Sequence, residues 1–188
     1  MPEIKAPRTQ HSMAALVVRS DLLSEAERLV DAMYVVHDTY FTADPAEKQA
    51  RLGSLRDEVV AVLGRREEAV GGAGDNKENS SDAQPRERPR DDAETRGRVL
   101  FLRGKALDVC DAHCEEAEEA LKKAVKLLPE CIEAYNTLGN CFWKRGTADG
   151  MKNARECFKN ALRQSENKVS LRQLSMVLRQ LGDKGSDE

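Results

Sequence analysis

The sequence predicts an all-α fold, in which a solenoid of helix-turn-helix repeats follows an N-terminal helical hairpin. Apolar residues recur at three- and four-residue steps over long stretches, which is the period of an amphipathic helix. Aromatic residues make up only 4% of the 188 residues, which disfavours a β-sandwich or barrel. In the C-terminal half, a pattern of small and apolar residues occurs twice at a period near 35 residues, as in helical-repeat proteins.

Residues 21–70 are predicted to form the hairpin, after a disordered N-terminus at 1–20 for which a weak mitochondrial leader is the alternative. The second helix begins at Asp44-Pro45-Ala46-Glu47, where Asp44 can cap free N–H groups and Pro45 suits the first turn. The short connection at 41–44 makes the two helices antiparallel neighbours. The apolar stripes are Leu22, Ala26, Leu29, Met33, Val36 and Tyr40 in the first helix and Leu52, Leu55, Val59 and Val62 in the second.

Residues 71–98 are predicted to be a disordered linker or insert, because they contain no Val, Ile, Leu, Met, Phe, Trp, Tyr or Cys to bury. The basic run at 86–90 is interpreted as part of this linker, with a nuclear-import or nucleic-acid patch as the alternative. The formal net charge of -3 argues against direct nucleic-acid binding. The longest apolar run, Met13–Val18, is too short for a membrane span or a secretory signal. The chain is therefore expected to be intracellular, with no membrane partner and with its five Cys as free thiols.

Residues 99–131 and 132–166 are predicted to be two successive repeats. Gly104 recurs as Gly139, and Leu121 recurs as Phe158. Glycine allows two antiparallel helices to approach, the Leu or Phe fills the gap between them, and Pro129 ends the second helix of the first repeat. The second repeat is predicted to carry about three additional residues in the turn between its helices, at 147–153.

Residues 167–182 are predicted to be the first helix of an incomplete third repeat, followed by a disordered tail at 183–188. Its outer face is expected to present Leu174, Met176, Val177, Leu178 and Leu181. Because the last helix of a solenoid needs a polar outer face or a cover, the chain is interpreted as the N-terminal portion of a longer array. Self-association through this helix is the alternative.

The segment Tyr135-x2-Leu138-Gly139-x2-Phe142 resembles the tetratricopeptide repeat (TPR) signature. Two further stretches narrow the resemblance: Leu29-Val30-Asp31 … Tyr34 … Asp38-Thr39-Tyr40-Phe41, and Asn167–Leu181, which reads NKVSLRQLSMVLRQL. With these stretches the chain resembles the stress-responsive activator family of TPR proteins, over about residues 22–70 and 99–181. The first twenty residues and the insert at 71–98 depart from the family pattern.

This resemblance implies a non-enzymatic adaptor of the nucleus and cytoplasm that uses no cofactor. The partners it implies are a nascent tubulin N-terminal peptide, junction-mediating and regulatory protein, and acetyltransferase coactivators. The ribosome is expected as a partner only of a longer protein, because the family's ribosome-facing residues and OB-fold lie outside this chain. The resemblance also implies that Arg179 binds the acidic residue near the tubulin N-terminus. A truncated structural or interaction fragment, which binds partners but lacks the ribosome-binding and OB-fold functions, is the alternative.

Six side chains are predicted to line the peptide groove formed by the first helices of the repeats. An Asn side chain can hold an extended peptide backbone, and an Arg side chain can bind a carboxylate through two hydrogen bonds. Residues 99–182 contain 14 basic and 11 acidic residues, which suits an acidic peptide. Counted from the glycine positions, the six groove residues are Lys105, Asn136, Asn140, Arg172, Met176 and Arg179.

A groove that clamps the carboxylate tails of chaperones is a weaker interpretation. Such a clamp needs Lys, Asn, Asn, Lys and Arg at positions where this chain has Phe101, Lys105, Thr137, Val169 and Gln173.

A metal site or an active site is also a weaker interpretation. Cys110, His113 and Cys114 provide too few ligands for structural zinc, so no metal is expected. Pairs such as Glu118-Glu119 are interpreted as a solvated helix face, and His37 as a rim residue of a partner contact. The sequence contains no phosphate loop or hydrolase motif, so no enzymatic activity is expected.

Overall fold

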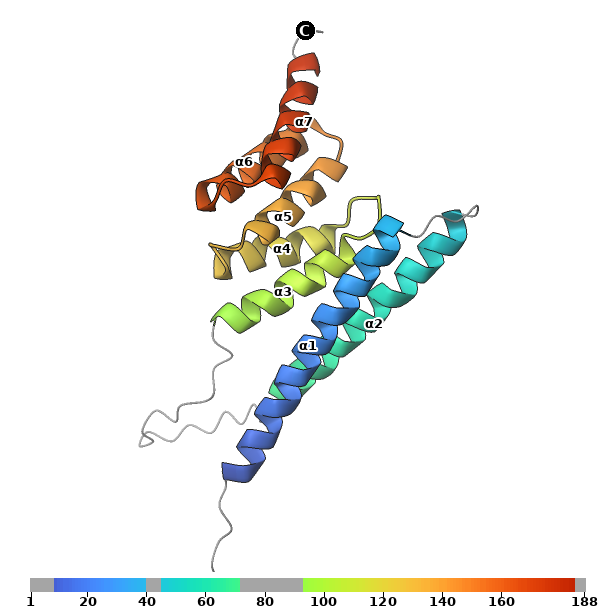
Figure 1. The fold of residues 1–188 in the computed structure, drawn as a ribbon, viewed down its shortest axis with the longest axis vertical. Coiled ribbons are helices and arrows are strands. Elements are labelled where there is room, and N and C mark those ends of the chain that lie inside the picture. Colours follow the sequence, from blue (N-terminus) through green and yellow to red (C-terminus); the bar gives the residue numbers. More distant parts are fainter. Residues whose placement is uncertain (1–8, 40–44, 72–92, 185–188) are drawn as a thin grey trace, which may run out of the picture.

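The computed structural model of the chain describes residues 9–39, 45–71 and 93–184. Within these ranges it contains seven helices and no strand (Figure 1). The predicted 41–44 connection, most of the predicted linker and the end of the predicted tail lie outside the described residues. None of the described helices is both long and apolar enough to cross a membrane. The helices are α1 (Thr9–Thr39), α2 (Pro45–Gly71), α3 (Ala93–Leu107), α4 (Glu115–Leu127), α5 (Ile132–Lys144), α6 (Ala148–Gln164) and α7 (Lys168–Lys184).

The first two helices form the predicted antiparallel hairpin: α2 starts near the end of α1 and runs back along it, and the first turns of α1 extend beyond the end of α2 (Figure 1). Arg19 Nη2 donates a hydrogen bond to the carbonyl oxygen of Ala69 at 2.7 Å, and Lys48 Nζ donates to that of His37 at 2.5 Å. Pro45 is the first residue of α2, where its missing N–H costs no helical hydrogen bond. The buried apolar residues are Leu23, Ala26, Val30 and Met33 of α1 and Leu52, Val59, Val62 and Leu63 of α2.

The segments predicted to be disordered are partly helical. Residues 9–20 belong to α1, which begins at Thr9, because this stretch contains strong helix formers such as Ala and Leu. At the C-terminal end of the chain, helix α7 continues to Lys184, two residues beyond the predicted helix end at 182. α3 begins at Ala93, inside the predicted linker. Gly97 is buried in that segment, and a Cβ there would lie 2.6 Å from Leu128 Cγ, so the missing side chain lets this turn pack.

α3 joins the hairpin to the repeats because it contributes to two hydrophobic cores. Val99, Leu102 and Ala106 belong to the core shared with α1 and α2. Phe101 belongs to the second core, which extends from α3 to α7. An ion pair between Arg98 and Glu27 adds a polar contact between α3 and α1. The hairpin is therefore a fixed neighbour of the first repeat.

The two repeats pack as the glycine pattern predicts. A Cβ at Gly104 would lie 2.6 Å from Leu121 Cγ, and a Cβ at Gly139 would lie 2.5 Å from Phe158 Cε1. Real Cβ atoms do not come this close to other heavy atoms, so glycine is what lets each helix pair meet at this separation. α4 ends at Leu127, two residues before Pro129.

We expect Gly139→Ala to lower the free energy of unfolding by about 1–3 kcal/mol, because the added methyl group would overlap the buried Phe158 ring. Gly64→Ala in α2 is the matched control. Nothing lies within 4 Å of a Cβ there, and alanine is a better helix former, so this variant should gain about 0.5–1 kcal/mol. Urea denaturation measures both values, and a loss of stability shared equally by the two variants would contradict the packing.

The additional residues of the second repeat lengthen its second helix, so the predicted long turn at 147–153 is wrong. α6 begins at Ala148, which leaves only 145–147 between α5 and α6, whereas 108–114 separate α3 from α4. Thr147 Oγ1 accepts a hydrogen bond from the Gly150 N–H at 3.0 Å and so caps the helix. The tight turn before it uses Gly146, whose φ of 67° favours glycine.

The last described helix, α7, packs on α6 as the first helix of a third repeat. The prediction that Leu174, Val177 and Leu181 face outward is wrong, because Val177 is fully buried and the two leucines are partly buried against the core. Val177 lies on the same helical stripe as Leu174 and Leu181, which pack against the core of the repeats. Leu171 and Leu178 remain 53% and 46% exposed, and they form the apolar outer side of the helix.

Candidate functional site

Three of the predicted groove residues form contacts between neighbouring first helices of the repeats. Asn136 Oδ1 of α5 accepts a hydrogen bond from Ser170 Oγ of α7 at 2.7 Å. One turn further along α5, Asn140 Oδ1 accepts a hydrogen bond from Gln173 Nε2 at 2.8 Å. These two hydrogen bonds connect α5 to α7, and the ion pair between Lys105 and Glu133 connects α3 to α5. Together they hold the first helices side by side along the face on which a peptide was predicted to lie.

Lys105 of α3 is a largely enclosed residue of the predicted groove. Its side chain is only 13% exposed, and its Nζ lies 2.5 Å from Glu133 Oε1 of α5. The same ammonium lies 4.8 Å from the ring centroid of Tyr34 and 5.7 Å from that of Phe101. Its charge is therefore already compensated by a carboxylate and by two aromatic rings.

Arg172, Met176 and Arg179 of α7 are exposed, in contrast to the equivalent positions on α3 and α5. Arg179 Nε donates a hydrogen bond to the Ser175 carbonyl oxygen of its own helix at 3.3 Å. Among the described residues, neither Arg172 nor Arg179 forms an ion pair. α7 thus presents two cations and a thioether that a ligand can reach.

A cleft of about 440 Å³ lies on the same side, between the end of α1 and the first helices. This volume falls within the range of small ligand-binding pockets. This cleft was not predicted from the sequence. One signal for it was present: Trp143 lies 36 residues before Arg179, at the equivalent position of the preceding repeat, and therefore on the predicted groove side. Three segments line the cleft: Tyr34 and His37 of α1, Asp108, Val109 and Asp111 of the turn after α3, and Asn140, Trp143 and Lys144 of α5.

The cationic group in the wall of this cleft is held by oxygen atoms of the protein. Lys144 Nζ lies 3.0 Å from Asp108 Oδ2 and 2.9 Å from the carbonyl oxygen of Cys110, and it also donates to the carbonyl oxygen of Asp108. Burial raises the pKa of the Asp108 carboxyl above its ordinary value, and the charge of Lys144 opposes this shift. Burial also raises the pKa of Tyr34, and the negative charges of Asp108, Glu133 and Asp38 raise it further.

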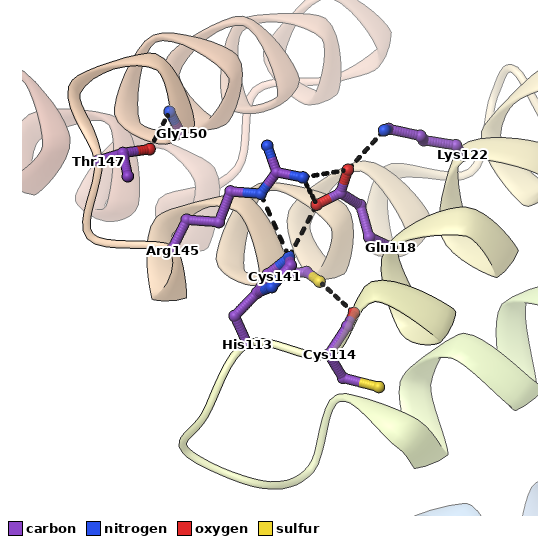
Figure 2. Close-up of polar contacts among 8 residues, drawn as sticks. All are labelled: His113, Cys114, Glu118, Lys122, Cys141, Arg145, Thr147 and Gly150. Atoms are coloured by element: carbon purple, nitrogen blue, oxygen red, sulfur yellow. Dashed lines mark hydrogen bonds and ion pairs between the residues drawn. The ribbon is translucent and has the colours of Figure 1, made fainter.

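A second polar cluster, shown in Figure 2, centres on Glu118 of α4. Arg145 Nη2 lies 2.9 Å from Glu118 Oε2, Lys122 Nζ lies 2.5 Å from its Oε1, and His113 Nε2 lies 2.8 Å from its Oε2. Burial alone would raise the pKa of this carboxyl, but the hydrogen bonds from Lys122 and His113 and the nearby positive charges lower it overall. Through His113 and Arg145, the cluster connects the turn between α3 and α4 and the turn between α5 and α6 to helix α4.

Glu118 is only 3% exposed, so the prediction that it belongs to a solvated face is wrong. The cause is the short turn after α5, which brings Arg145 over α4; a pattern of local charges does not reveal such a contact. The neighbouring Glu119 is exposed, as predicted. His113 is engaged by Glu118 within this cluster.

All five Cys are free thiols in the structure, as predicted. Burial raises the pKa of the Cys141 and Cys157 thiols to about 12, which makes them unreactive core residues at neutral pH. The part of the chain that the structure describes contains no group of three His, Cys, Asp or Glu side chains placed to hold a metal ion.

Antiparallel helix pairs that meet at a glycine, stacked so that their first helices share one side, define a TPR-type helical solenoid. Over 168 residues, 89% of its length, the chain is 37% identical to tetratricopeptide repeat protein 5 from Mus musculus and 38% identical to that from Homo sapiens. The Bos taurus protein is 37% identical over 169 residues. The chain spans about a third of the length of these relatives, 33% in each case. No protein-family model matches the chain.

These similarities confirm that the chain resembles tetratricopeptide repeat protein 5, the TPR protein to which the resemblance in the sequence pointed. They support a role in protein–protein interaction, which is the general role of TPR proteins.

Proposed function

We propose that the chain is a non-enzymatic adaptor that binds peptide segments of partner proteins along the side formed by α3, α5 and α7. The observation that carries this proposal is the exposure of Arg172, Met176 and Arg179, while the equivalent polar residues on α3 and α5 are engaged within the protein. A guanidinium group that is exposed on a rigid helix can bind a carboxylate through two hydrogen bonds.

The partners proposed from the family resemblance are a nascent tubulin N-terminal peptide, junction-mediating and regulatory protein, and acetyltransferase coactivators, in the nucleus and cytoplasm. Of these, the tubulin peptide is the most direct test because it is short. Arg179 is proposed to contact its acidic residue, with Arg172 and Met176 beside it on α7. Lys105, Asn136 and Asn140 are proposed to support the groove through their contacts between first helices.

The test is fluorescence anisotropy with a labelled tubulin N-terminal peptide, at low and at high salt. A hydrogen bond to a charged group contributes about 1.5–3 kcal/mol, so Arg179→Ala should weaken binding roughly tenfold or more. Salt should weaken binding to the unsubstituted protein, because exposed charges are screened.

Arg163→Ala is the matched control, because Arg163 is also exposed but lies on α6 and contacts Asn160. It should leave the affinity unchanged. Absence of peptide binding by the unsubstituted chain, or equal losses in the two variants, would contradict the proposal.

A further inference from the structure

We propose that the cleft between α1 and the first two repeats binds the cationic side chain of an arginine or lysine residue in a bound peptide. This inference rests on the proposed adaptor function and adds a recognition site to it. The cleft has a volume of about 440 Å³, and three separate segments meet around it: the end of α1, the turn after α3, and α5. Its walls hold acidic side chains, an indole and a tyrosine.

The cleft carries an excess of negative charge. Its one lysine, Lys144, is held by Asp108 and by the carbonyl oxygens of residues 108 and 110, so its ammonium is compensated within the wall. Asp111 is exposed and forms no ion pair with the described residues. A cationic ligand therefore meets a carboxylate that has no other partner.

A buried acceptor supports the same conclusion. Asp108 is 3% exposed, and its Oδ1 accepts no hydrogen bond from the residues that the structure describes. A buried carboxylate oxygen without a donor is costly. The ammonium of Lys144, on the other oxygen of the same carboxylate, offsets part of this cost, and a second cation in the cleft would offset more. Burial is the main cause that raises the pKa of Tyr34, and the nearby negative charges of Asp108, Glu133 and Asp38 raise it further, so these carboxylates lie close to the tyrosine wall of the cleft.

Trp143 provides the aromatic wall. Its Nε1 donates a hydrogen bond to Gln180 Oε1 at 2.7 Å, which fixes the orientation of the indole. Tyr34 already has an ammonium beside its ring, that of Lys105, whereas no cation is recorded over the indole among the described residues. A tryptophan face attracts a guanidinium or ammonium group more strongly than other aromatic rings do. An anionic ligand would instead meet Asp111 and Asp108 without a free cation.

Trp143 is the only tryptophan in the chain, so its fluorescence reports on the cleft directly. The experiment is a titration with N-acetyl-arginine amide at constant ionic strength, compared with N-acetyl-citrulline amide, which has the same shape without the charge. We expect a saturable fluorescence change with the arginine compound and at least tenfold weaker binding of the citrulline compound. Asp111→Asn should weaken arginine binding about three- to tenfold.

Two controls separate this cleft from the rest of the proposal. Asp149→Asn alters an exposed carboxylate on α6 and should leave the titration unchanged. The second control is the tubulin-peptide anisotropy assay itself, which reports on α7 and not on Asp111, so a failure of the peptide-binding proposal does not resemble a failure here. Equal binding of the arginine and citrulline compounds, or unchanged arginine affinity in Asp111→Asn, would overturn the inference.

Discussion

Phe158→Ala is expected to lower the free energy of unfolding by about 3–5 kcal/mol, which is a large part of the stability of a small domain. Phe158 is fully buried, and its ring fills the space that Gly139 leaves between α5 and α6. Removing the ring would leave a cavity between α5 and α6, because Gly139 has no side chain to fill it. Urea denaturation followed by circular dichroism measures the difference.

Leu178→Ala is the control for this prediction. Leu178 is also a large apolar residue on a repeat helix, but it is 46% exposed, so its truncation should cost less than about 1 kcal/mol. A loss in Phe158→Ala no larger than that in Leu178→Ala would show that the glycine–phenylalanine contact does not hold the second repeat together.

Glu118→Gln is expected to lower the free energy of unfolding by about 1–3 kcal/mol at pH 7, because Gln has no negative charge to pair with Arg145 and Lys122, and its amide NH2 cannot accept a hydrogen bond as the second carboxylate oxygen does. The pKa of Glu118 is lower in the folded protein than its ordinary value of 4.5. The carboxylate therefore stabilises the fold above pH 4.5, and this contribution is lost as the pH falls through its folded pKa. The difference between variant and parent should shrink as the solution is acidified.

Glu119→Gln is the matched control, one residue along the same helix. Glu119 is exposed, and its substitution should change stability by less than about 0.5 kcal/mol at any of these pH values. Denaturation curves at pH 7 and pH 4 test both variants. A difference between Glu118→Gln and the parent that grows on acidification would mean that the cluster does not depend on the carboxylate.

The repeat architecture could be predicted from the sequence because its signals are local or periodic. Two glycines 35 residues apart, Gly104 and Gly139, indicate which helices pair, and their predicted partners are Leu121 and Phe158. The structure contains both contacts. The helix boundaries were predicted less well. Neither the start of α1 at Thr9 nor that of α3 at Ala93 is marked by the large apolar residues on which the prediction relied.

The polar contacts could not be predicted because they join segments far apart in the chain. Glu118 and Arg145 meet only through the turn after α5, and Lys105 meets Tyr34 only because the hairpin packs on α3. For the same reason the cleft beside Trp143 forms only when the end of α1, the turn after α3 and α5 come together in the fold. A sequence pattern identifies which faces of a helix are polar, but it does not identify the partner across a tertiary contact.

The central claim is that peptides bind along the side formed by the first helices. Amide chemical-shift mapping by NMR, with the tubulin N-terminal peptide added to the isotopically labelled chain, tests this claim most directly. We predict that the shifts cluster on α5 and α7, with the largest near Arg172, Met176 and Arg179. Shifts confined to the outer helices α4 and α6, or to the far end of the hairpin, would contradict it.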